Sequence, residues 1–76
     1  MNSERRKRIA KICEQLEEIQ SEISAIADEE QECYDNLPEA FQYAERGERM
    51  SEIADTLNDA ANDVESIINN LQEVQE

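Results

Sequence analysis

The sequence predicts an all-α protein, an antiparallel two-helix coiled-coil hairpin that dimerises into a four-helix assembly. Apolar residues recur at alternating steps of three and four along two long stretches, which is the heptad pattern of a coiled coil. The only proline lies between the two stretches and marks a turn. The 76 residues form one domain, 1–76, with a helix at about 4–35, a turn at about 35–38 and a helix at about 38–75.

Each stretch predicts a helix whose apolar seam faces the other helix. The first stretch is apolar at seven of eight seam positions, which are Ile9, Ile12, Leu16, Ile19, Ile23, Ile26, Glu30 and Cys33. The second stretch is apolar at all eight, which are Met50, Ile53, Leu57, Ala60, Val64, Ile67, Leu71 and Val74.

The segment 35–39 connects the two helices. Asn36 can cap the N-terminus of the second helix, and Glu39 can complete a capping box. Pro38 is tolerated in a first helical turn and disfavours helical backbone at the residue before it. Because the connection is short, the two helices should be antiparallel neighbours.

Gly47 allows two interpretations of the second helix, which is either broken at this residue or continuous through it. After 44–46 it can end a short helix as a left-handed capping residue, which would break the helix at 47. Alternatively, Ala40, Gly47, Ala54 and Ala61 form a row of small residues seven apart on one continuous helix. The row favours continuity, because a glycine inside a helix costs only about 1 kcal/mol.

The expected dimer interface lies at the end of the second helix. Folding the chain back at 36–37 places Ile23 near Met50, Ile12 near Ala61 and Ile9 near Val64, which leaves the last turns with little opposite them. Only 38% of the residues are hydrophobic, so a lone hairpin has a small core and should self-associate. The candidate interface residues are Ile67, Ile68, Leu71 and Val74, with Ala54 and Ala61 from the row of small residues.

The charge balance narrows the classes of partner. Twenty acidic and seven basic residues give a net charge of -13, which argues against direct binding to nucleic acid. Five of the basic residues lie at 5–11, so the basic start of the chain contrasts with an acidic body. No apolar run approaches the length of a membrane span, and the chain is expected in the cytoplasm.

The residue types present also argue against an enzyme. There is no histidine, so a Ser-His or Cys-His nucleophile is impossible, and one glycine cannot build a phosphate-binding loop. No cofactor or metal site is expected. Cys13 and Cys33 would lie about 30 Å apart on one helix, too far for a disulfide, and are interpreted as two buried free thiols.

One face of the second helix carries Glu52, Asp55, Asp59 and Asp63. The three aspartates repeat every four residues, about 6 Å along the axis, which is comparable to the spacing of phosphates on one nucleic-acid strand. Two interpretations stay open. The face is a solvated surface of an acidic protein, or it is a nucleic-acid mimic that occupies a basic cleft of a nucleic-acid-binding protein.

The motifs DNLPE at 35–39 and AERGERM at 44–50 resemble those of short acidic helical proteins encoded by bacteriophages and prophages. The resemblance implies a phage or prophage accessory protein in the host cytoplasm, and it transfers no catalytic residue. Together with the helical pattern, it favours a non-enzymatic, self-associating module that binds a protein partner. The alternative is an anti-defence inhibitor that acts as an acidic nucleic-acid mimic.

Overall fold

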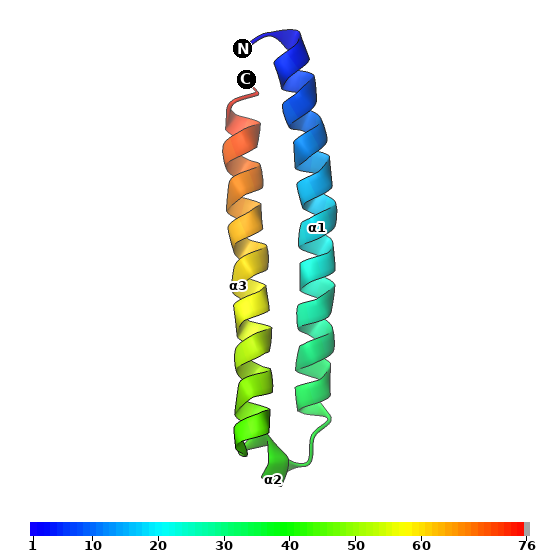
Figure 1. Ribbon diagram of the computed structural model, residues 1–76, viewed down its shortest axis with the longest axis vertical. Helices are drawn as coiled ribbons and strands as arrows, with labels where there is room; N and C mark the ends of the chain where they lie inside the picture. Colours follow the sequence, from blue (N-terminus) through cyan, green and yellow to red (C-terminus); the bar gives the residue numbers. More distant parts are fainter. Residues whose placement is uncertain (76) are drawn as a thin grey trace.

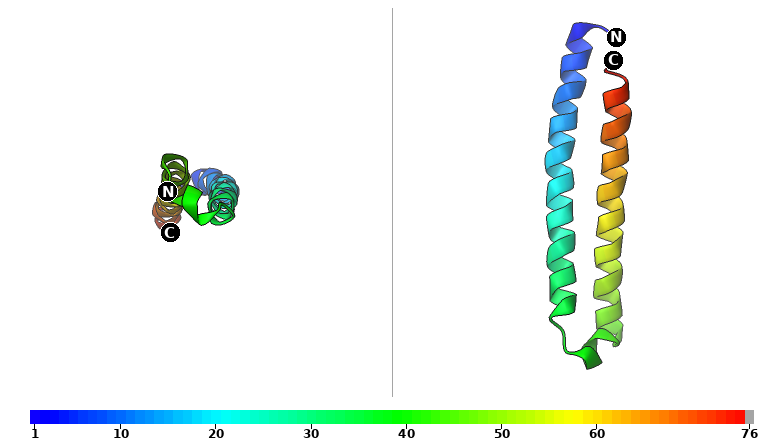
Figure 2. Two further views of the ribbon diagram at one scale, coloured as in Figure 1. Left: turned by 90° about the horizontal axis from the view of Figure 1, so that it is seen from below. Right: turned by 180° about the vertical axis from the view of Figure 1, so that it is seen from behind.

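The computed structural model describes residues 1–75 and contains three helices, α1 (Ser3–Asp35), α2 (Glu39–Gln42) and α3 (Glu45–Glu73). No strand occurs among these residues, which confirms the predicted all-α class. The long helices α1 and α3 lie side by side, with α2 at one end of the pair and both chain termini at the other (Figures 1 and 2).

The molecule is a thin rod of 58 × 14 × 12 Å along its principal axes. Each long helix has one long neighbour, and the short α2 meets only the start of α3, so most of each long helix is covered on one side within a single chain (Figure 2). No large hydrophobic side chain among the described residues is fully buried. The fold thus leaves much apolar surface outside its core.

Local signals set the two ends of α1. The Asn2 side chain accepts a hydrogen bond of 2.9 Å from the backbone N–H of Arg5, which satisfies one of the free donors of the first turn. At the other end Asn36 is the C-cap of α1, and its N–H donates to the carbonyl of Glu32. The expected role of Asn36 as an N-cap of the second helix is wrong, because Pro38 takes that position without a side-chain cap.

The expectation of one continuous helix from Pro38 is also wrong, but the break is not at Gly47. Ala44 is extended, with φ -78° and ψ 162°, and separates α2 from α3. Gly47 lies inside the first turns of α3 and does not have positive φ. The chain therefore bends three residues before the glycine.

The physical role of Gly47 is close packing against α2. A Cβ atom built on it would clash with the backbone carbonyl oxygens of Phe41 and Gln42. Without a side chain, the backbone at Gly47 can meet the end of α2 where it folds back on α3. Gln42 also holds α2 to the end of α1, because its Nε2 donates to the carbonyl of Tyr34 at 3.2 Å.

The register between the long helices differs from the expected one. Gln20 Nε2 donates to the carbonyl of Ala61 at 3.2 Å, whereas folding back at 36–37 placed Ile12 near Ala61. The difference is about one heptad, because the chain continues through α2 before α3 begins at Glu45. The last turns of α3 therefore lie beside the first turns of α1 and are not left without a neighbour (Figure 1).

Candidate functional site

The core between α1 and α3 is built from one row of residues on each helix, spaced seven apart. We call these the core rows. On α1 the row is Cys13, Gln20, Ala27 and Tyr34, and on α3 it is Gly47, Ala54, Ala61 and Ile68. Cys13, Ala27 and the four α3 residues are buried, while Gln20 and Tyr34 are partly buried.

Small side chains allow the two helices to approach closely along these rows. Ala27 and Ala54 are both 0% exposed. The two helices run in opposite directions (Figure 1). One step of seven residues back along α1 from Ala27 reaches Gln20, and one step forward along α3 from Ala54 reaches Ala61, and these two residues share a hydrogen bond. A second step in the same direction reaches Cys13 and Ile68, and one step in the other direction from Ala27 and Ala54 reaches Tyr34 and Gly47, so the core rows meet in successive layers.

A second row on each helix is half-buried at the edge of the core. On α1 it is Ile9, Leu16, Ile23 and Glu30, and on α3 it is Met50, Leu57, Val64 and Leu71. These residues were all expected in the seam. Glu30 ends its row next to the turn, where its carboxylate still reaches solvent.

The remaining half of the expected seam lies at the outer edge of the helix pair, where Ile53 and Ala60 are half-buried and the other residues are exposed. We call these residues the outer rows, which are Ile12, Ile19, Ile26 and Cys33 on α1, and Ile53, Ala60, Ile67 and Val74 on α3. Ile12, Ile19 and Ile26 are 44%, 49% and 46% exposed, and Ile67 and Val74 are 48% and 47% exposed. The expectation that Ile12, Ile19 and Ile26 pack inside the hairpin is therefore wrong, whereas Ile67 and Val74 were expected at its surface.

Both outer rows lie on the same side of the rod. On each helix the outer row lies three residues after the half-buried row, and the core row lies four residues after it. The three rows thus follow one another in the same order around both helices. When two such helices run in opposite directions, the corresponding rows of both helices lie on the same side of the pair. The outer rows and the neighbouring half-buried rows thus form one apolar surface, which we call the outer face.

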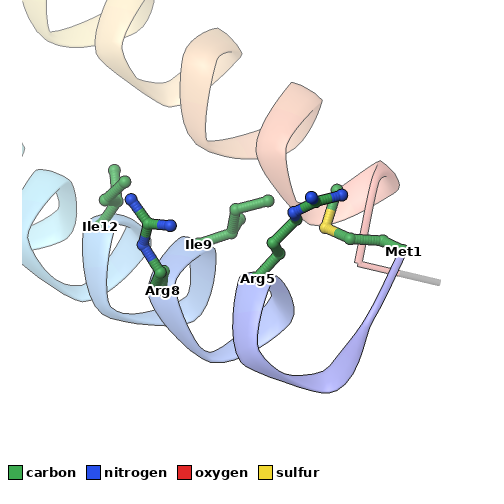
Figure 3. Close-up of a pocket in the computed structure, with 5 residues that line it drawn as sticks. All are labelled: Met1, Arg5, Arg8, Ile9 and Ile12. Carbon is green, nitrogen blue, oxygen red and sulfur yellow. The ribbon is translucent and has the colours of Figure 1, made fainter.

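A hollow marks the end of the outer face beside the chain termini. It is lined by Met1, Arg5, Arg8, Ile9 and Ile12. Figure 3 shows these side chains on one side of α1, next to the last turns of α3. The hollow combines apolar side chains with two guanidinium groups, so it suits a ligand that is apolar with an acidic edge.

The expected interface residues divide between the core and the outer face. Ala54, Ala61 and Ile68 are buried in the core of a single chain, so the expectation that they contact a second subunit is corrected. Leu71 is half-buried, and Ile67 and Val74 belong to the outer face.

The sequence interpretation missed the α1 half of this surface. Three adjacent rows, rather than two, carry apolar residues on both helices. An apolar stripe three residues wide per heptad is typical of helices covered on two sides, as in bundles. This width was the signal that could have identified Ile12, Ile19 and Ile26 as surface residues.

The acidic residues of α3 lie outside the core. Glu52, Asp55, Asp59 and Asp63 are all exposed. Glu52 forms an exposed ion pair of 3.4 Å with Arg49. By heptad position, Glu52 and Asp59 point away from α1, whereas Asp63 borders the outer row.

The cysteines behave differently from one another. Cys13 is buried and Cys33 is exposed, so the expectation of two buried thiols holds only for Cys13. Both are free, in agreement with the expected absence of a disulfide. Within residues 1–75, no three His, Cys, Asp or Glu side chains are grouped as metal ligands, and no helix has the length and apolar character of a membrane span.

The fold and this surface define the chain as a long pair of α-helices with one apolar face. Comparison with protein-family models, with curated proteins and with solved structures gave no match.

Proposed function

We propose that this chain is a non-enzymatic protein-binding module, an antiparallel coiled-coil hairpin that self-associates into a four-helix assembly. The observation that carries the proposal is the outer face, on which isoleucines at heptad spacing stay about half exposed, among them Ile12, Ile19 and Ile26 at 44–49%. Contiguous apolar surface of this kind is typical of interaction sites in proteins of this size. In keeping with the sequence resemblance, we place the module among phage or prophage accessory proteins.

The exposed area supports self-association. The chain exposes 5803 Å², whereas a compact folded monomer of 8.8 kDa exposes about 4,800 Å² by the usual scaling of area with mass. The excess of roughly 1,000 Å² is comparable to the area of about 800 Å² that each partner covers in a standard interface. One second subunit is therefore enough to bring the exposed surface to an ordinary value.

The proposal predicts that the purified chain is dimeric at micromolar concentration. Sedimentation equilibrium in 150 mM salt should give twice the mass of 8.8 kDa, because burial of the outer face depends little on ionic strength. The same mass is expected in 1 M salt. A monomeric mass in both buffers would contradict the proposal.

A second candidate function uses the acidic residues of α3. Glu52, Asp55, Asp59 and Asp63 are exposed together, so their carboxylates are accessible to a basic cleft. In this function the protein is a nucleic-acid mimic or anti-defence inhibitor of a host nucleic-acid-binding protein. A basic partner held this way would bind in low salt and dissociate as salt rises, whereas a partner held by apolar contacts would not.

Replacing Asp55, Asp59 and Asp63 together by asparagine tests this candidate. The triple variant should keep its helicity and dimeric mass, because these side chains lie outside the core rows and the outer rows. If the acidic surface is the binding site, a partner captured from the native host in low salt should bind at least tenfold more weakly to the variant. Equal capture by the variant and the parent chain would exclude the mimic.

A further inference from the structure

We propose that the outer face binds a second copy of this chain turned end for end, with Ile19 and Ala60 of each copy on the two-fold axis. The inference rests on the proposed self-association and specifies its surface and orientation. In this arrangement α1 packs against the partner's α1, and α3 packs against the partner's α3.

The outer row of α1 is symmetric about Ile19. At steps of seven, the row continues from Ile19 to Ile12 and Arg5 in one direction, and to Ile26 and Cys33 in the other. A second α1 that runs in the opposite direction therefore places Ile12 against Ile26, and Ile19 against its own counterpart. Only a reversed copy makes this row complementary to itself.

The outer row of α3 is symmetric in the same way about Ala60. One step of seven in either direction reaches Ile53 and Ile67, so a reversed copy pairs these two isoleucines. The hydrogen bond between Gln20 and Ala61 places the centres of the two rows within about 3 Å of each other along the rod. A single two-fold axis can thus pass through Ile19 and Ala60 together.

The charges of α1 favour the reversed orientation. Residues 5–11 carry five basic and no acidic side chains, while residues 28–35 carry five acidic and no basic ones. Turning one copy end for end places each basic segment beside the acidic segment of the other copy. Aligned copies would instead gather both basic segments at one end of the dimer and both acidic segments at the other.

The hollow at the end of the outer face provides a site for this pairing. Arg5 and Arg8 line it, and both are exposed on the outer side of α1 (Figure 3). Glu29 lies ten residues from Ile19 toward the turn, Arg8 lies eleven residues from Ile19 toward the N-terminus, and Glu29 borders the outer row at the acidic end. In the reversed dimer, Glu29 of one copy is placed beside Arg8 of the other.

Cysteine cross-linking tests the orientation directly. Cys33→Ser removes the exposed native thiol, and Ile19→Cys or Ala60→Cys is then introduced into the full chain. Each variant then holds the buried Cys13 and one exposed cysteine. Mild oxidation or a short bis-maleimide should convert most of each variant to a covalent dimer, because both introduced positions lie on the proposed axis. Ser21→Cys, which is exposed about 160° around α1 from the outer row, is the control that should not cross-link efficiently.

A charge exchange gives a second readout. Arg8→Glu should weaken dimerisation about tenfold, since two symmetric pairs become repulsive. Adding Glu29→Arg to the same chain should restore it. Rescue of this kind supports the reversed orientation, because the two side chains then face each other across the interface.

The outcomes separate the inference from the proposal on which it rests. A dimer in which Ile19→Cys cross-links only to Ala60→Cys of another chain overturns the reversed orientation in favour of aligned copies. A dimer in which neither position cross-links overturns the outer face as the interface, while self-association stands. A monomer in sedimentation overturns both.

Discussion

Replacing Gly47 by alanine should lower the free energy of unfolding by about 2 kcal/mol, although alanine is the better helix former. The new Cβ atom would clash with the carbonyl oxygens of Phe41 and Gln42. Both contacts are to backbone atoms, so no side chain can rotate away. Either α2 moves off the first turn of α3, or the first turn of α3 unwinds.

Urea denaturation of the variant and of the parent chain, followed by circular dichroism at equal concentration, measures this effect. Glu48→Ala is the matched control, because it adds alanine at an exposed position one residue further along α3 and should change stability by less than about 0.5 kcal/mol. A Gly47→Ala variant more stable than the parent would show that the bend at Tyr43–Ala44 is not held by this close approach.

The helical class was predictable because heptad periodicity and the lone proline act locally. Apolar residues at steps of three and four favour a helix whatever lies opposite, and Pro38 follows directly after the residues that end α1. The bend at Ala44 had no such signal. Alanine is a strong helix former, and it is extended there because α2 packs back against Gly47, a contact that arises only in the folded chain.

The surface was harder to predict than the helices, because three apolar rows fit two possible seams. Ile9 and Leu16 belong to both possible seams. The two seams differ in whether Ile12 and Ile19, or instead Cys13 and Gln20, face the other helix. Hydrophobicity favours the isoleucines. The structure instead packs the smaller residues inward, where Ala27 and Ala54 let the helices approach closely, and leaves the isoleucines outside.

Ile19→Asp should weaken dimerisation by a hundredfold or more, the largest effect expected at any single position of the outer face. Ile19 is 49% exposed in the single chain, so the substitution leaves the core rows untouched. In the proposed dimer, however, the two new carboxylates would lie beside each other on the two-fold axis and among isoleucines. Burial of like charges without partners costs on the order of several kcal/mol.

Sedimentation across a concentration series gives the dissociation constants of the parent, of Ile19→Asp and of Ser21→Asp. Ser21→Asp adds the same charge to an exposed site about 160° around α1 from the outer row and should dimerise like the parent chain. Circular dichroism at concentrations where the parent is dimeric shows whether each variant keeps its helices. If Ile19→Asp retained parental affinity, the outer face would not be the interface, because no rearrangement around the axis could hydrate two carboxylates while keeping the isoleucine rows packed.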